Sequence, residues 1–140
     1  MKAGERKAWE VLAKVARAAV WDQGKGAGGR ARMGNRATVV DGITFQSKLE
    51  SDRYRELELL NRSGEVAYFL RQVPFDVAPK VRYRADFVIV WNRSGPACEI
   101  VTVEDTKGFL TSTARVKIAA VEHRYRIKIT ILTRANVRRF

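Results

Sequence analysis

Histidine and cysteine are almost absent from this sequence, which holds one of each, His123 and Cys98. A single cysteine leaves no intrachain disulfide and no thiolate metal cluster within the sequence. A single histidine argues against mechanisms that need a histidine pair, including those of HNH nucleases, zinc hydrolases and ribonuclease A-type acid–base pairs. We therefore interpret Cys98 as a small buried hydrophobic residue at a strand edge, and His123 as a structural residue.

Long apolar runs are also missing. No stretch approaches the ~18 consecutive apolar residues that span a bilayer, and the opening residues MKAGERKAWE lack the hydrophobic core of a secretory signal. We therefore expect a cytoplasmic protein with no membrane partner.

Acidic residues are scarce relative to basic ones. The 27 Lys and Arg exceed the 15 Asp and Glu by 12, and the sequence pI is about 10.4. A surface of this charge favours a phosphate-bearing partner, and nucleic acid above all. Membrane-surface attraction and simple solubility remain open on charge alone. The 140 residues, of which 46% are apolar and 30% charged, fit one globular domain.

The first 35 residues are predicted to form a segment separate from a domain over 36–140. Apolar residues recur at steps of three and four from Glu5 to about Val20, a pattern that indicates an amphipathic helix for core packing, a dimer contact or DNA. The glycine-rich, basic stretch after it is either a mobile arm that closes on phosphates or an inert linker. The predicted DNA-binding residues are Lys25, Arg30, Arg32, Arg36 and Lys48.

The first part of the predicted domain carries two local signals. Asp41-Gly42 between residues 38–40 and 43–45 predicts a β-hairpin with a type I′ turn. Ser47 with Glu50 three residues later is a capping box, which predicts a helix from Lys48 to about Asn61 that ends at Ser63-Gly64.

The rest of the chain alternates β-rich and helical patterns. Strands are expected over 66–70, 73–77, 82–91, 99–106 and 126–133, with a turn at 93–96 and a helix over 111–123. Strands flanked by helices predict an α/β or α+β fold, a mixed β-sheet flanked by helices, with the N-terminal helix as an addition.

The chemistry concentrates in two short motifs. Asp86 lies in Arg84-Ala85-Asp86, at the start of one predicted strand, and Asp105 lies nineteen residues later near the end of the next. Because these strands form an antiparallel hairpin, the two carboxylates are expected to lie side by side. Residues two apart on a strand share a face, so Lys107 projects with Asp105, while Thr106 points away and offers its backbone carbonyl.

Carboxylate and carbonyl oxygens are ligands that suit Mg²⁺. A bound cation of this kind lowers the pKa of a water molecule, and Lys107 would position the nucleophile or offset charge on the phosphorane. The motifs therefore predict a hydrolase of phosphodiester bonds, with Mn²⁺ expected to substitute for Mg²⁺ and no small-molecule cofactor. The competing interpretations are a strand-end carboxylate paired to Arg84 and a surface ion pair between Asp105 and Lys107.

At this point the sequence resembles the PD-(D/E)XK nuclease superfamily, with Arg84-Ala85-Asp86 in the place of its Pro-Asp and Asp105-Thr106-Lys107 as its (D/E)XK motif. The proline is missing. The resemblance extends over roughly residues 36–133 to small phage-encoded Holliday junction resolvases, and it implies a restriction-endonuclease-like fold in a protein of the host cytoplasm. It also implies Mg²⁺ dependence, a homodimer, cleavage of branched double-stranded DNA, and Glu50 as a further member of the metal site. Glu50 could instead serve only to cap its helix.

Three functions stay open on the sequence. The first is a homodimeric, structure-specific endonuclease that makes paired symmetric cuts in four-way junctions during DNA recombination. The second is a sequence-specific or end-processing nuclease with the same metal site. The third is a noncatalytic DNA-binding module in which the acids are structural. The predicted catalytic residues are Glu50, Asp86, Asp105 and Lys107, and the predicted metal ligands are Asp86, Asp105, Glu50 and the carbonyl of Thr106.

Overall fold

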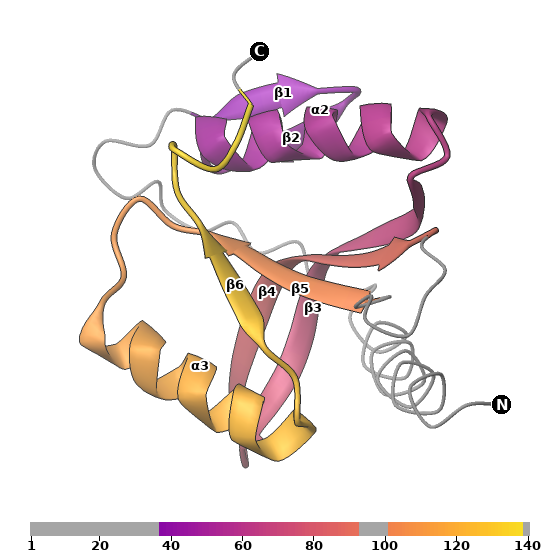
Figure 1. Ribbon diagram of the computed structural model, residues 1–140. Coiled ribbons are helices and arrows are strands. Elements are labelled where there is room, and N and C mark those ends of the chain that lie inside the picture. The colour runs from indigo at the N-terminus through magenta and orange to yellow at the C-terminus, as the bar shows by residue number, and fades with distance from the viewer. Residues whose placement is uncertain (1–36, 93–100, 139–140) are drawn as a thin grey trace, which may run out of the picture.

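A computed structural model of the chain describes residues 37–92 and 101–138 (Figure 1). The expected N-terminal helix, the glycine-rich arm, Cys98 and the turn at 93–96 lie outside these residues. Within them the order of elements is β1 (Thr38–Val40), β2 (Ile43–Phe45), α2 (Lys48–Arg62), β3 (Val66–Ala78), β4 (Val81–Trp91), β5 (Val101–Thr106), α3 (Ser112–Tyr125) and β6 (Ile129–Leu132).

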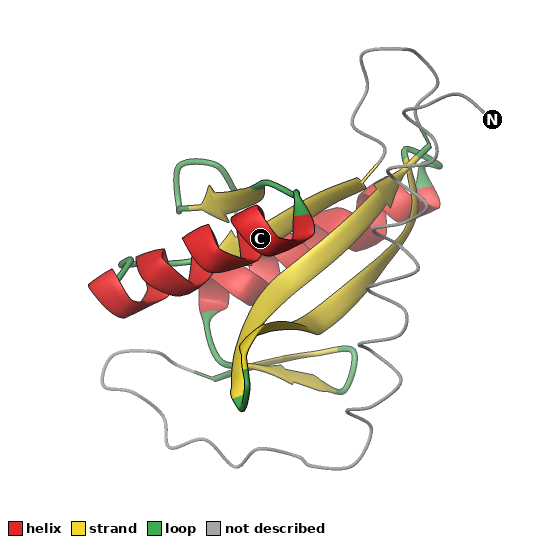
Figure 2. Cartoon of the chain, turned by 90° about the horizontal axis from the view of Figure 1, so that it is seen from below, coloured by secondary structure: helices red, strands yellow, loops and turns green. Residues whose placement is uncertain are grey.

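The strands form two sheets. β1 and β2 make a separate hairpin, and the larger sheet has the order β3-β4-β5-β6 with only the β5–β6 pair parallel. Helix α2 and the small hairpin lie on one side of the larger sheet and α3 on the other (Figure 1), and Figure 2 shows the strands between the two helices from the α3 side. The predicted α+β class, a mixed sheet flanked by helices, is therefore confirmed.

Two apolar clusters hold this arrangement together. The α2-side cluster is Val40, Phe45, Tyr54, Leu57, Val66, Phe87 and Ile89. The α3-side cluster is Val73, Phe75, Tyr83, Ala85, Val88, Val103, Ile118, Val121 and Ile129. Each helix thus covers one face of the sheet, and burial of this apolar surface is the main force that fixes the layers.

Local sequence signals set the early elements. Asp41 and Gly42 both have positive φ, 51° and 76°, as a type I′ turn requires, so the hairpin prediction is confirmed. The Ser47 side chain accepts a hydrogen bond from Glu50 N over 3.1 Å, and the helix ends with Ser63 as its C-cap, which confirms both predicted helix ends.

Three predicted boundaries were wrong. β3 runs unbroken from Val66 to Ala78, although two strands were expected with a break at residues 71 and 72. Pro74 is tolerated inside it because β3 lies at the edge of the described sheet. α3 extends to Tyr125 and Arg126 caps it in the left-handed region at φ 56°, so the final strand begins at Ile129 and not at 126.

The β3–β4 ribbon changes face at one point. Residues two apart on a strand normally share a face, yet Phe69 packs with the α2-side cluster, whereas Val73 belongs to the α3-side cluster. Between them Gln72 has φ 52°, a conformation that costs a non-glycine residue of order 1–3 kcal/mol. On β4 the same change falls between Ala85 and Phe87, on either side of Asp86.

Candidate active site

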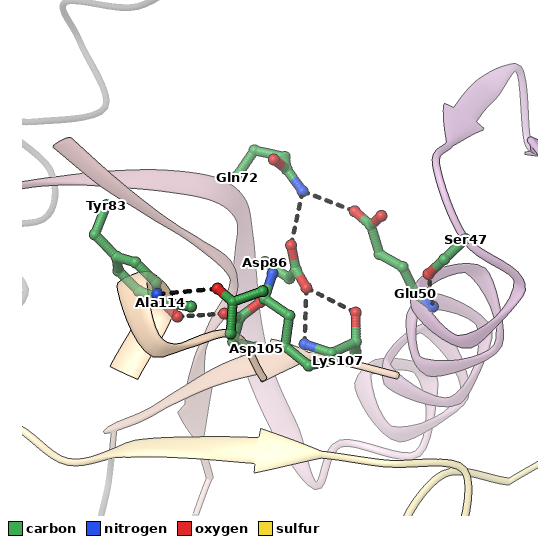
Figure 3. A network of polar contacts seen from close by, with 10 residues as sticks. Ser47, Glu50, Gln72, Tyr83, Asp86, Asp105, Lys107 and Ala114 are labelled. Atoms are coloured by element: carbon green, nitrogen blue, oxygen red, sulfur yellow. Dashed lines mark hydrogen bonds and ion pairs between the residues drawn. The ribbon is translucent and has the colours of Figure 1, made fainter. Parts of the chain in front are cut away.

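The predicted acids converge at this change of face. Figure 3 shows Asp86 from β4, Asp105 and Lys107 at the end of β5, and Glu50 from the first turn of α2 around one region, with Gln72 between Glu50 and Asp86. Glu50, Asp86 and Asp105 are all buried. Burying three acids destabilises a fold unless their charges are paired or bind a cation. This cluster is therefore the candidate site.

Asp86 and Asp105 are opposite each other, as the sequence predicted. Phe87 pairs with Glu104 in the antiparallel β4–β5 ladder, which places Asp86 across from Asp105. The position of Asp86 along its strand was predicted wrongly. It lies in the interior of β4, which continues back to Val81, because those earlier residues pair with the second half of β3.

One oxygen of Asp86 is fixed by Thr106. Asp86 Oδ2 accepts hydrogen bonds of 2.7 Å from both the backbone N–H and the hydroxyl of Thr106. The expectation that the Thr106 side chain points away is therefore wrong, since its hydroxyl reaches across to the neighbouring strand. These two bonds orient the Asp86 carboxylate.

Asp105 is the most enclosed acid of the cluster, with no exposed surface. Its Oδ2 accepts a hydrogen bond from the Tyr83 hydroxyl. Its Oδ1 lies 3.0 Å from Lys107 Nζ, within ion-pair distance, but forms no well-oriented hydrogen bond among the described residues. The ion pair between Asp105 and Lys107 is therefore not a surface pair, because the Asp105 carboxylate is fully buried, although Lys107 is about one-third exposed.

Electrostatics agree with this crowding. Burial raises the pKa of Asp105 to about 7, and the neighbouring Asp86 carboxylate adds to this by accepting a hydrogen bond from the protonated form of Asp105 and by charge repulsion, although Tyr83 and Lys107 act to lower it. Burial and the same Asp105 carboxylate raise the pKa of Tyr83, so its hydroxyl remains a donor at neutral pH. Two carboxyl groups that cannot both ionise easily form a site suited to a cation.

Glu50 reaches the same place from the helix. Gln72 Nε2 donates to Glu50 Oε1 over 2.7 Å and to Asp86 Oδ1 over 3.1 Å, so one amide bridges two acids. Burial, then the charge of Asp86, raises the pKa of Glu50 against the lowering effect of Gln72 and Arg71. The backbone N–H of Glu50 donates to the cap residue Ser47 while its carboxylate faces the site, so the capping contact leaves the carboxylate within the acidic cluster.

Glu104 has a different role from its neighbour Asp105. Arg53 donates to Glu104 through Nε and a terminal nitrogen, each over 2.8 Å, and also to Glu56 over 2.8 Å. This buried pair ties α2 to β5. It leaves Glu104 with both oxygens satisfied and away from the candidate site.

Sequence reasoning missed the role of Tyr83 and the role of the Thr106 hydroxyl. Tyr83 lies three residues before Asp86, and nothing in the local pattern relates it to Asp105. Gln72, which bridges Glu50 and Asp86, did leave a signal in the sequence. The predicted break in β3 coincides with its positive φ.

Among the predicted DNA-binding residues, only Lys48 is described. It begins α2 and forms an ion pair with Asp52, one turn along the helix, so part of its charge is neutralised. Lys25, Arg30, Arg32 and Arg36 lie outside the described residues.

The residues also bear on the predicted metal. In the part of the chain that the structure describes, no three His, Cys, Asp or Glu side chains form a ready-made cation cage. The donors nevertheless suit a hard cation, because Asp105 Oδ1 is buried without a hydrogen bond and crowds against Asp86. A bound cation held by Asp86 and Asp105 would offset the charge repulsion between the two carboxylates.

Fold and site together define an α+β domain with a cluster of buried acids and one lysine at the centre of its mixed sheet. Residues 30–138 match the model of a family described as protein of unknown function (DUF1064), and since this match covers most of the chain, the chain belongs to that family. A search of curated proteins found no match. No helix in 37–92 or 101–138 is long and apolar enough to cross a membrane.

Proposed function

We propose that this protein is a Mg²⁺-dependent DNA endonuclease, and that its substrate is branched DNA of the four-way junction type, cut symmetrically by a homodimer. The observation that carries the proposal is the pair of buried carboxyl groups of Asp86 and Asp105 on adjacent strands, with Lys107 Nζ 3.0 Å from Asp105 Oδ1. The order Glu50, Asp86, Asp105, Lys107 also resembles that of PD-(D/E)XK nucleases.

In this proposal Asp86, Asp105, Glu50 and the backbone carbonyl of Thr106 hold the metal. When bound, Mg²⁺ would supply a Lewis acid for a phosphoryl oxygen and a water molecule of lowered pKa. The other contacts keep the acids in place: Tyr83 holds Oδ2 of Asp105, and Thr106 holds Oδ2 of Asp86. Fixed groups of this kind need no rearrangement during reaction, which is the main source of electrostatic catalysis.

Lys107 is the natural partner of the reacting phosphate. Its side chain is partly exposed at the end of β5, and its ammonium group lies beside a buried carboxylate. From there it can orient the attacking water or offset negative charge on the phosphorus oxygens as the leaving oxygen departs. Asp105 in turn keeps the ammonium group in position.

Four-way junctions are proposed as the substrate because their resolution needs two symmetric cuts, which two identical sites in a two-fold dimer provide. The excess of 12 basic residues favours binding through phosphates, so that DNA shape would be recognised more than base sequence. Binding that falls steeply with salt is expected on the same grounds.

The test is cleavage of a labelled four-way junction, a replication fork and a linear duplex, each with Mg²⁺, with Mn²⁺ and with chelator. We expect metal-dependent paired cuts in the junction and much slower cutting of the duplex. Equal cutting of all three would remove the junction part of the proposal and leave a nonspecific nuclease. Tight binding without cutting of any substrate would overturn the nuclease proposal in favour of a noncatalytic DNA-binding protein.

A further inference from the structure

Two arginines on the α2 side of the sheet, Arg53 and Arg71, have buried guanidinium nitrogens, and they differ in their hydrogen bonds. Arg53 uses its guanidinium on Glu104 and Glu56. Arg71, in β3, has a buried Nε that makes no hydrogen bond among the described residues. An unpaired buried donor is unfavourable, so a group of this kind in a folded protein calls for an explanation.

Aromatic rings hold the Arg71 guanidinium in place. Its central carbon lies 4.6 Å from the ring centroid of Phe45 and 5.6 Å from that of Tyr54. Attraction between a cation and a ring face orients the guanidinium plane without using any of its N–H groups. A guanidinium held by ring contacts can still donate its N–H groups to an anion, and its planar fork matches the oxygens of a phosphate.

Arg71 also lies next to the acidic site. It directly precedes Gln72, the amide that bridges Glu50 and Asp86. The positive charge of Arg71 acts to lower the pKa of Glu50, so the guanidinium is within electrostatic reach of the cluster. A cation in this place offsets the repulsion that three buried acids would exert on an approaching phosphate.

We propose that Arg71 is a phosphate-binding residue, whose guanidinium takes a non-bridging oxygen of the DNA backbone beside the phosphodiester that is cut. This inference rests on the proposed nuclease function and adds to it the residue that anchors the strand. The bond is a charge-assisted hydrogen bond to one phosphate and carries no base specificity. Arg53 is less suited to this role, because each of its three guanidinium nitrogens already donates to a buried or half-buried carboxylate.

The test measures binding and not cleavage. The full chain and its Arg71→Met variant are titrated against a fluorescent four-way junction and a linear duplex, with Ca²⁺ in place of Mg²⁺ and at several salt concentrations. Methionine keeps an unbranched stem on the two rings and removes the charge and the fork. We expect affinity to fall by about tenfold on both DNAs and the salt slope to fall by about one.

Arg62→Met is the matched control, since it removes the same charge from an exposed position at the end of α2. It should change affinity by less than about twofold. Arg71→Gln is made in parallel, and thermal unfolding establishes which variants fold; the same tenfold loss is expected from it if the methionine variant does not fold. A folded Arg71 variant that binds like Arg62→Met overturns the proposal.

The outcome is separable from that of the nuclease proposal. Wild type that cuts DNA while Arg71→Met binds normally would sink only the role of Arg71. Wild type that binds DNA through Arg71 and never cuts would sink only the nuclease. A DNA with one uncharged methylphosphonate linkage locates the contact. The linkage that weakens DNA binding by the wild type should not change DNA binding by Arg71→Met. An equal loss of affinity in both proteins would mean that another residue contacts that phosphate.

Discussion

Glu104 and Asp105 are adjacent buried acids on β5, and the fold treats them in opposite ways. Glu104 faces α2, where Arg53 satisfies both of its oxygens. Burial works to lower the pKa of Arg53, and pairing with Glu104 raises it above its ordinary value, so the pair stays charged. Asp105 faces Asp86 and has a raised pKa and one buried oxygen without a hydrogen bond. Glu104 therefore joins β5 to α2, whereas Asp105 belongs to the crowded acidic cluster of the candidate site.

The largest expected effect concerns activity, and it is tested at Asp86, the acid opposite Asp105. Asp86→Asn should reduce junction cleavage by about 10³-fold, because an amide is a poor cation ligand and cannot replace the carboxylate. DNA binding in Ca²⁺ should change by less than about threefold, since the phosphate contacts that dominate affinity lie elsewhere. Asp76→Asn is the control, because Asp76 is a well-exposed acid that pairs with Arg82. Unaltered cleavage by Asp86→Asn would show that the acids are structural.

The second prediction concerns stability, to which the buried pair of Glu104 with Arg53 should contribute strongly. Arg53→Met leaves Glu104 buried and unpaired, and we expect the free energy of unfolding to fall by about 3–5 kcal/mol in urea denaturation. Adding Glu104→Leu to Arg53→Met should recover much of that loss, since no buried charge then remains. Arg82→Met, in the exposed pair with Asp76, should cost under about 1 kcal/mol. Equal losses from Arg53→Met and Arg82→Met would mean that the buried pair contributes nothing special.

Asp105, in contrast to the Glu104 pair, should make the metal-free protein less stable as pH rises. Its pKa is about 7 in the folded protein and ordinarily 3.8, so the folded state binds the proton more tightly. The stability that this proton provides is complete below about pH 4 and is lost as pH rises through 7. Glu50, whose pKa is also raised, acts in the same sense.

Unfolding in urea with chelator, measured from pH 5 to 8, checks this expectation. The Asp105→Asn variant should gain about 1–3 kcal/mol relative to wild type over that range. A difference between the two proteins that stays constant with pH would contradict the raised pKa.

The smallest effect concerns metal binding itself. Mg²⁺ at about ten times its Kd should stabilise the wild type by about 1.4 kcal/mol, measured as a rise in Tm. Asp86→Asn should abolish this rise and Asp76→Asn should keep it. The measurement needs no substrate, so the same rise in both variants would argue against a cation at Asp86 independently of the proposed nuclease function.

Features set by neighbouring residues were the ones that the sequence predicted well. The Asp41-Gly42 turn and the Ser47 cap depend on a few adjacent residues, and both are confirmed. The pairing of Asp86 with Asp105 followed from hairpin symmetry, since a register in an antiparallel pair fixes every other partner.

What the sequence missed depends on contacts between distant segments. Tyr83 meets Asp105, and Thr106 meets Asp86, across strands whose twist no local pattern specifies. The continuous strand β3 was divided in the prediction because Gln72 interrupts its alternation. The interruption arises because β3 packs with both the α2-side and the α3-side clusters. Tertiary packing of this kind overrides strand propensity.

The change of face at Gln72 and Asp86 has a consequence for how the protein tolerates mutation. On one side of this point Phe69 and Phe87 pack with the α2-side cluster, and on the other Val73 and Ala85 belong to the α3-side cluster, so the acids lie where the two clusters meet. Trimming Leu57 on one side or Val121 on the other should each loosen one set of contacts to the acids. A screen for lost activity should therefore recover conservative core substitutions from both layers.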